Sequence, residues 1–170
     1  MTKRRPLPDA DYLRSLFTYE PDTGLLRWKV DRAQMRAGDI AGHQGNKDNR
    51  YVRVSVDDIV YRGHLIIWKM VTGEDPSGPI DHENTIKNDN RWVNIRLATK
   101  SLNQANIGLL KTNTSGVKGV HWYKAYQCWS SMFIKDGECY FVGYFDDLEE
   151  AKAAYQKRYR EVYGEFARFE

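Results

Sequence analysis

The chain has 170 residues, of which 41% are hydrophobic and 13% aromatic, and it carries a formal net charge of +3. This composition predicts a folded, soluble protein of one or two small domains that are long enough to bury a core. No apolar run approaches the ~20 residues of a membrane span, and no continuous apolar segment follows the basic start, so we expect neither a membrane protein nor a secretory signal.

The charges and the cysteines narrow the expected partners and location. Residues 113–170 carry 8 Lys and Arg against 9 Asp and Glu, so the small positive charge lies in residues 1–112. Mild basicity permits a nucleic-acid partner without identifying one. Cys128 and Cys139 lack CxxC spacing and are too few for a disulfide scaffold, so we expect a reducing cytoplasm.

The first segment, from Pro8 to about Gly73, is predicted to be a small strand-rich unit. Helical spacing predicts short helices, and alternation of apolar residues predicts strands. The expected helices cover residues 9–17 and 64–72, and the expected strands cover 25–30, 51–56 and 59–63.

The second segment, residues 80–106, reads IDHENTIKNDNRWVNIRLATKSLNQAN and contains six Asn. Each buried amide needs hydrogen-bond partners, so such a density of Asn indicates a role beyond packing. We expect a strand over 78–82, a polar loop, a second strand over 95–99 and a helix that ends at Gly108. These elements form a compact ββα unit.

Residues 109–116 are predicted to be a linker, because residues 111–116 are polar and contain a Gly, and periodicity lapses there. The third segment, 117–170, has three expected strands over 117–123, 128–135 and 139–145, with Asp136-Gly137 at a tight hairpin turn. An amphipathic helix follows from Asp147, its N-cap, to Gly164. The expected fold class is α+β, with a strand-rich N-terminal unit, a ββα finger, and a three-stranded antiparallel sheet packed on one helix.

The side chains of the ββα unit suit the hydrolysis of a phosphodiester. This reaction needs a base to activate water and a cation to neutralise charge on the phosphate. His82 can accept a proton near neutral pH, and Asp81 offers a hard carboxylate for an ion such as Mg²⁺. Asn103 offers an amide oxygen. Because neighbours on a strand point to opposite faces, Asp81 and His82 can share one site only at a strand end.

The pattern Asp-His, polar loop, Asp-Asn-Arg, Asn-Ile-Arg and a helical Asn resembles the HNH endonuclease motif of phage and intron-encoded homing nucleases. The resemblance covers roughly residues 8–107 and implies a ββα-metal finger at about 78–108 within an HNH domain of residues 1–108. It implies His82 as general base, Asp81 and Asn103 as metal ligands, and Asn94 as the residue that pins the loop by backbone hydrogen bonds.

The same resemblance implies one divalent ion, Mg²⁺ or alternatively Mn²⁺, double-stranded DNA as partner, and products with 5′-phosphate and 3′-hydroxyl ends. It implies a phage protein in a bacterial host, or a bacterial cytoplasmic one. Arg91 and Arg96 are candidate phosphate contacts. Two positions depart from the family pattern: Glu83 stands where an apolar residue is usual, and Thr85 replaces a Gly, although Thr resists the positive φ that Gly allows.

The third segment resembles the plant ethylene-response-factor (Apetala-type) DNA-binding domain, which we assign to residues 117–170. That family lays the outer face of its sheet in the major groove. By alternation Trp129, Ser131 and Phe133 are expected to face the helix, and Ser130, Met132 and Ile134 to face outward. The candidate DNA contacts of this segment are Lys118, His121, Tyr123, Lys124 and Tyr126.

Two other functions fit the sequence. The chain is alternatively a DNA-binding transcriptional regulator with an inactive nuclease module, or a structural phage protein that uses both modules only to pack. His64 is expected to be packed or hydrogen-bonded, and His43 to be exposed. No Cys and His set has zinc-ligand spacing, so a structural zinc is not expected. The oligomeric state is left open by the sequence.

Overall fold

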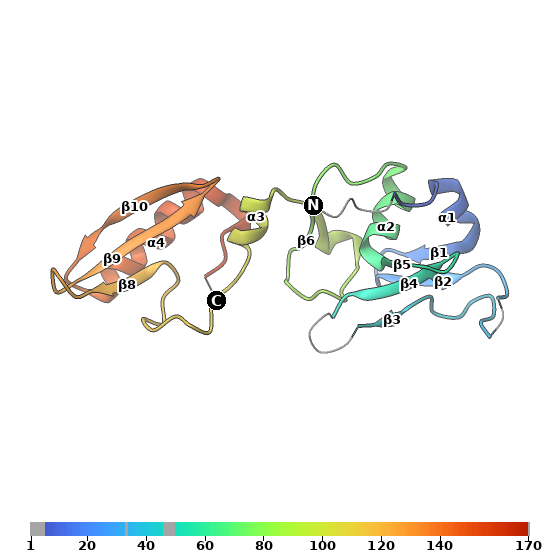
Figure 1. Cartoon of the computed structure of the whole chain (residues 1–170), viewed down its shortest axis with the longest axis horizontal. Helices are drawn as coiled ribbons and strands as arrows, with labels where there is room; N and C mark the ends of the chain where they lie inside the picture. The colour runs from blue at the N-terminus through green and yellow to red at the C-terminus, as the bar shows by residue number, and fades with distance from the viewer. Residues whose placement is uncertain (1–5, 33, 46–49, 170) are drawn as a thin grey trace. The chain divides into compact units, whose positions relative to one another are not determined.

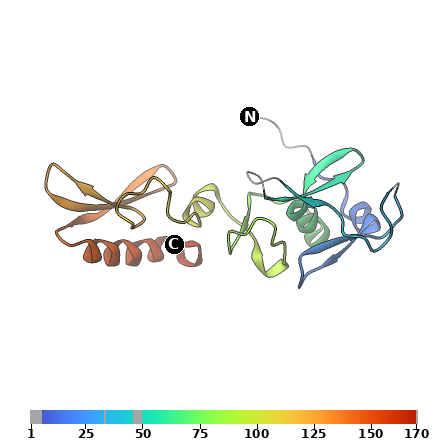
Figure 2. The same ribbon diagram turned by 90° about the horizontal axis from the view of Figure 1, so that it is seen from below.

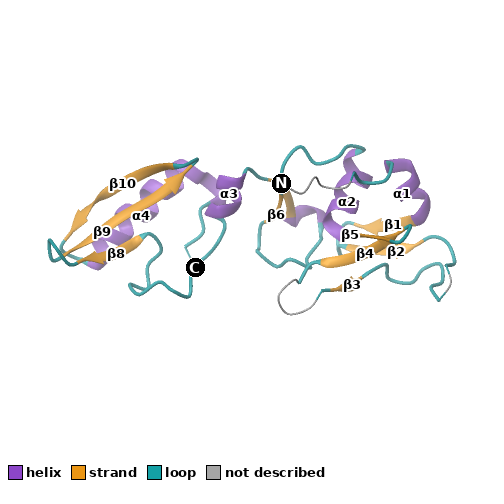
Figure 3. Ribbon diagram, in the orientation of Figure 1, coloured by secondary structure: helices purple, strands orange, loops and turns teal. Residues whose placement is uncertain are grey.

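The computed structural model describes residues 6–32, 34–45 and 50–169. The chain has an α+β fold, as the sequence predicts (Figures 1 and 3). It divides into two compact units between Ala98 and Thr99, and each unit is described here by itself. Among the described residues, no helix is long and apolar enough to cross a membrane.

The first unit opens with a helix and a hairpin. Helix α1 (Ala10–Leu16) is capped by Asp9, whose carboxylate accepts hydrogen bonds from the backbone N–H groups of Asp11 and Tyr12. Strands β1 (Phe17–Glu20) and β2 (Leu25–Trp28) follow as an antiparallel pair. The predicted helix over 9–17 and the predicted strand over 25–30 are therefore confirmed, whereas strand β1 was not predicted.

A three-stranded antiparallel sheet and a helix complete the scaffold. The sheet has the order β3-β4-β5, with β3 (His43–Gln44), β4 (Val52–Val56) and β5 (Ile59–Arg62). Helix α2 (Gly63–Thr72) starts directly after β5 and ends at Gly73, where φ is +81°. One face of the sheet carries the fully buried Val54 and Val56 into a core that includes Ile66 and Ile67 of α2.

The Asn-rich segment forms a small ribbon on this core. Strand β6 (Ile80–His82) pairs antiparallel with β7 (Ile95–Leu97), and the 3-10 helix η1 (Trp92–Asn94) leads into β7. Ile80 and Ile95 join the hydrophobic core of the unit. The ribbon is short, so its connecting loop, residues 83–91, depends on contacts outside the strands.

The β1–β2 hairpin supports the end of that loop. The Tyr19 hydroxyl donates to the backbone oxygen of Asn90 at 2.8 Å. The backbone N–H of Trp92 donates to the backbone oxygen of Pro21 at 3.1 Å. At Gly24, where φ is +75°, a Cβ would lie 2.5 Å from the backbone nitrogen of Arg91. The hairpin thus approaches the loop backbone as closely as only a glycine allows.

The second unit consists of a short helix, a sheet and a long helix. Helix α3 (Lys100–Ala105) precedes an antiparallel sheet of order β10-β9-β8. Its strands are β8 (Val120–Tyr123), β9 (Cys128–Lys135) and β10 (Glu138–Phe145). Helix α4 (Leu148–Tyr163), capped by Asp147, lies along one face of the sheet (Figure 2), and the 3-10 helix η2 (Gly164–Phe166) follows it. The sheet-on-helix architecture predicted for this segment is confirmed.

The Phe133 ring fixes the sheet on the helix. Its centroid lies 6.0 Å from that of Tyr155, 5.1 Å from that of Tyr159 and 5.8 Å from that of Tyr163, all on α4. Ser131 is buried on the same strand, as expected. Ser130, however, was expected to face solvent and is buried. It lies on the central strand opposite His121 and Tyr144, and these two larger side chains flank it.

One helix boundary differs from the sequence-based expectation. Helix α3 ends at Ala105, before the predicted end at Gly108. The end of α3 is held within its own unit, because Lys118 Nζ donates to the backbone oxygens of Ala105 at 2.8 Å and of Ile107 at 2.6 Å. The predicted domain boundaries and the predicted linker 109–116 stay predictions.

Replacement of Gly24 by Ala should destabilise the first unit more than replacement of Gly38 by Ala. Both glycines have positive φ, but nothing lies within 4 Å of a Cβ at Gly38. Both variants therefore lose about 1–2 kcal/mol to backbone strain, and Gly24→Ala loses about 1–3 kcal/mol more to the backbone clash. Thermal and urea denaturation of the two variants measures the difference. Equal losses would contradict the close contact between the hairpin and the loop.

Candidate active site

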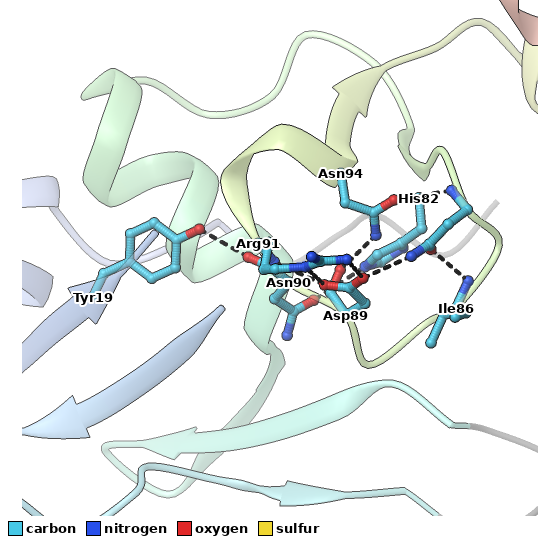
Figure 4. Close-up of polar contacts among 8 residues, drawn as sticks. Tyr19, His82, Ile86, Asp89, Asn90, Arg91 and Asn94 are labelled. Atoms are coloured by element: carbon cyan, nitrogen blue, oxygen red, sulfur yellow. Dashed lines mark hydrogen bonds and ion pairs between the residues drawn. The ribbon is translucent and has the colours of Figure 1, made fainter. Parts of the chain in front are cut away.

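His82 is buried at the end of strand β6, and its ring is held on several sides. Its Nε2 lies 3.0 Å from Asn90 Oδ1 (Figure 4). Because an amide oxygen can only accept, Nε2 carries the proton of this hydrogen bond. The ring of His64, on α2, meets the His82 ring edge-on at 5.1 Å between centroids, and the Tyr51 ring lies 5.9 Å away. His64 is buried, as expected of a packed histidine.

The environment keeps His82 neutral. Burial lowers the pKa of the imidazole, and the positive charge of Lys87 lowers it further. The hydrogen bond to Asn90 and the charges of Asp81 and Asp89 raise it, but the net pKa lies below the usual value of 6.5. The neutral form therefore predominates at pH 7, and it persists to a lower pH than in an exposed histidine. A neutral imidazole can accept a proton from water.

Asp81 lies beside His82 in sequence and faces a cation. Arg96 is its partner in the β6–β7 register, and Arg96 Nε donates to Asp81 Oδ2 at 3.2 Å. Arg96 Nη1 also lies 3.8 Å from Glu83 Oε2. The Arg96 side chain is mostly buried, so the structure places it in an ion-pair network with two carboxylates rather than at the surface where a phosphate contact was predicted.

Asn94 makes the two backbone hydrogen bonds that its expected role requires. Its Oδ1 accepts from the backbone N–H of Asn84 at 2.9 Å, and its Nδ2 donates to the backbone oxygen of Asp89 at 2.7 Å. One buried amide thus bridges the two sides of the loop that follows His82 (Figure 4). The loop has few apolar contacts, so this bridge fixes its shape.

Asp89 is the second anchor of the loop. Arg91 donates to both carboxylate oxygens, from Nε at 2.8 Å and from Nη2 at 2.6 Å, and Asn84 Nδ2 donates at 2.6 Å. These bonds, led by that from Arg91, lower the pKa of the Asp89 carboxyl to about 2. Asp89 therefore stabilises the fold above its unfolded pKa and loses this contribution only as the pH falls toward 2. Arg91 remains half exposed, next to the site.

Thr85 adopts the backbone conformation that its side chain disfavours. Its φ is +63°, and its N–H donates to the backbone oxygen of His82 at 2.9 Å in a tight turn. A β-branched residue in this region costs on the order of 1–2 kcal/mol relative to Gly. The tight turn after His82 therefore forms even though Thr85 disfavours its positive φ.

The remaining predicted site residues lie in the second unit. Asn103 is exposed on α3, and His121, Tyr123, Lys124 and Tyr126 are exposed on or next to β8. Lys118 is different. Its Nζ donates to three backbone oxygens, those of Ala105, Ile107 and Arg168, and burial lowers the pKa of its ammonium to about 8. Its predicted DNA contact is not supported, because three carbonyl groups occupy its donors.

The sequence reasoning missed Asn90, although the run Asp89-Asn90-Arg91 was noted as part of a motif. Its side chain is the polar partner of His82, and its backbone oxygen accepts from Tyr19. Nothing in the spacing distinguishes Asn90 from the exposed Asn88 two residues earlier. Asn90 differs from Asn88 only in being buried and in its contact with the β1–β2 hairpin.

The donor chemistry fits a hard divalent cation. The described residues contain no group of three or more His, Cys, Asp and Glu placed to hold a metal ion. One buried carboxylate, Asp81, lies beside His82 in sequence and is paired with Arg96, and a carboxylate with an amide and waters suits Mg²⁺ better than a transition metal. The role of Asn103 as the amide ligand stays a prediction.

Replacement of Asn94 by Ala should lower the melting temperature. It leaves the Asn84 N–H and the Asp89 backbone oxygen without their partner, at a cost of about 1–3 kcal/mol. Asn88→Ala, at an exposed position of the same loop, is the control and should have little effect. Calorimetry of both variants measures the difference; an unchanged melting temperature for Asn94→Ala would show that the bridge does not hold the loop.

The comparisons with known proteins agree with this geometry. The family model described as HNH endonuclease matches residues 61–105, which include α2, the β6–β7 ribbon and α3. Protein 3.8 of Escherichia phage T7 is 35% identical over 109 residues, or 64% of this chain and 89% of protein 3.8. No solved structure matches the chain. The chain therefore belongs to the family of protein 3.8, and its residues 61–105 are an HNH endonuclease domain.

Proposed function

We propose that the chain is a metal-dependent endonuclease of the phage homing type that hydrolyses double-stranded DNA. The observation that carries the proposal is the state of His82. It is buried and neutral, its Nε2 is fixed on Asn90, and a carboxylate, Asp81, is adjacent in sequence. A base whose pKa lies somewhat below the working pH is present in the form that accepts a proton.

His82 acts as the general base. The hydrogen bond from Nε2 to Asn90 selects the tautomer in which Nδ1 has the lone pair, so Nδ1 takes the proton from the attacking water. The resulting hydroxide attacks the phosphorus and the P–O3′ bond breaks. The leaving 3′ oxygen takes a proton from solvent water, so the products carry 5′-phosphate and 3′-hydroxyl ends. Asn90 is a positioning residue, because it acts through the imidazole rather than on the substrate.

Asp81 and Asn103 would hold one divalent ion, Mg²⁺ or Mn²⁺. When bound, such an ion supplies positive charge to the phosphate oxygens and the leaving 3′ oxygen. Asp81 would exchange or share its contact with Arg96 when it binds the ion. Arg96 would then remain close enough to the carboxylates of Asp81 and Glu83 to limit their repulsion.

The second unit would contribute affinity for DNA. His121, Tyr123, Lys124 and Tyr126 would form its contact surface, as the resemblance to the Apetala-type domain implies. Arg91 would add a phosphate contact in the first unit. We do not include Lys118 in this set, because its ammonium is bound to three carbonyl groups.

A DNA-binding regulator with an inactive nuclease module is the second candidate function. The observation that favours it is the ion pair between Arg96 and Asp81, since a permanent pair would exclude the metal. Plasmid nicking by the purified protein with Mg²⁺, compared with the same reaction in EDTA, separates the two. Cleavage that EDTA abolishes supports the nuclease, and DNA binding without cleavage in any divalent ion supports the regulator.

His82→Ala should abolish cleavage and leave DNA binding nearly intact. Loss of the base costs about 10²-fold to 10⁴-fold in rate, whereas the base does not hold the duplex. Asp81→Ala should also stop cleavage, through loss of the metal ligand. Asp22→Ala, which removes an exposed carboxylate elsewhere in the same unit, is the control. Full activity of either site variant in Mg²⁺ would refute the assignment.

Two replacements of Asn90 should move the acid limb of the pH–rate profile in opposite directions. The bond to Asn90 raises the pKa of His82, so Asn90→Ala should lower that pKa, shift the acid limb to lower pH and reduce the rate. Asn90→Asp places a negatively charged carboxylate next to the His82 ring, so it should raise the pKa of His82 and shift the acid limb to higher pH. A merely structural role would lower the rate without moving the limb. Single-turnover cleavage between pH 4.5 and 8 distinguishes the two.

A further inference from the structure

The solvent face of the β3-β4-β5 sheet carries a row of basic side chains. In the register of the sheet, His43 is opposite Arg53, and Arg53 is opposite Arg62, so the three residues cross all three strands on one face. The alternate residues Val54 and Val56 are fully buried, which places Arg53 and Ser55 on the opposite, solvent side of β4. We call the three residues the basic row.

The arrangement of the basic row does not stabilise the sheet, because Arg53 lies directly opposite Arg62. Like charges directly opposite each other on neighbouring strands repel and destabilise the pair. Within the described part of the chain, neither Arg53 nor Arg62 forms an ion pair with a carboxylate, and the next cross-strand pair on this face is Ser55 with Val60. The face thus concentrates positive charge that no carboxylate of the described residues balances by an ion pair.

The basic row leads to the catalytic histidine. The Arg62 guanidinium carbon lies 4.5 Å from the centroid of the Tyr51 ring, and the Lys87 ammonium lies 5.3 Å from it. The Tyr51 ring in turn lies 5.9 Å from that of His82. Tyr51 therefore bridges two cations, one from the sheet and one from the loop after β6, beside the His82 imidazole.

We propose that Arg53 and Arg62, together with Lys87 next to His82, bind the phosphate backbone of DNA and guide it to His82. This inference rests on the proposed function and adds a substrate surface to it. Guanidinium groups bind phosphate oxygens in pairs, and adjacent cations on one face fit a polyanion whose charges repeat at short intervals. A ring that carries a cation on its face fixes the direction of that cation.

The test is equilibrium binding of the full chain to duplex DNA in EDTA, across a salt series from 50 to 300 mM. Two phosphate contacts contribute about 1.8 to the slope of log K against log salt. The double variant Arg53→Gln with Arg62→Gln should reduce the slope by about that amount and weaken binding at least tenfold at low salt. Lys87→Gln should reduce the slope by about 0.9.

The matched control is Arg36→Gln with Arg158→Gln. This variant removes the same charge from two exposed arginines, each paired with a carboxylate, and it should leave the slope at the wild-type value. The melting temperature provides a second readout. Removal of repelling charges should leave the Arg53 and Arg62 variant as stable as the wild type or more stable, whereas a structural role predicts a loss.

The outcomes separate this inference from the proposed function. The proposed contact between the basic row and DNA is wrong if the Arg53 and Arg62 variant keeps the wild-type slope, or if the control reduces the slope equally. In that case, cleavage of DNA by the wild-type protein would still support the proposed nuclease function. A wild-type protein that neither binds nor cuts DNA in Mg²⁺ or Mn²⁺ would overturn both. A reduced slope confined to the row variant, with unchanged stability, supports the inference.

Discussion

The hydrogen bond between His82 Nε2 and Asn90 Oδ1 is the interaction on which the arrangement of the site depends. It fixes the tautomer and the orientation of the imidazole, and it joins the two ends of a loop that has little apolar surface of its own. Asn90 keeps its place because the Tyr19 hydroxyl binds its backbone oxygen and because Gly24 lets the β1–β2 hairpin approach the Asn90–Arg91 backbone. A hairpin more than sixty residues away in sequence therefore holds the partner of the histidine.

Polar bonds replace hydrophobic packing around the loop. Asn94 bridges Asn84 and Asp89, and Arg91 holds Asp89 with two charge-assisted bonds. Such a network is stable only if its members are satisfied, because an unpaired buried amide costs more than a bond returns. The network also explains how Thr85 can retain a positive φ. The surrounding bonds determine the turn, and the local strain at Thr85 is offset by them.

The charged groups near His82 form two sets. Asp81 is paired with Arg96 in the β6–β7 register, so the carboxylate that would hold a metal ion is kept next to a cation. Lys87 and Arg62 flank Tyr51, and within the described part of the chain neither forms an ion pair with a carboxylate. Burial of His82 among Tyr51, His64 and Asn90 then lowers its pKa, despite two nearby carboxylates.

The sequence by itself determined most of the helices and strands, though not β1 or β3, as well as the α+β class and the identity of the residues at the end of β6, because periodicity, turn residues and motif order act over short distances. It also gave the correct hydrogen-bonding role for Asn94, whose partners lie within ten residues. Only the tertiary structure decided that Asn90 binds His82, that Arg96 faces Asp81, that Lys118 binds three carbonyl groups, and that Arg53 lies opposite Arg62. These pairings depend on strand register and on contacts between distant segments, and a side chain's chemistry does not specify which distant group will face it.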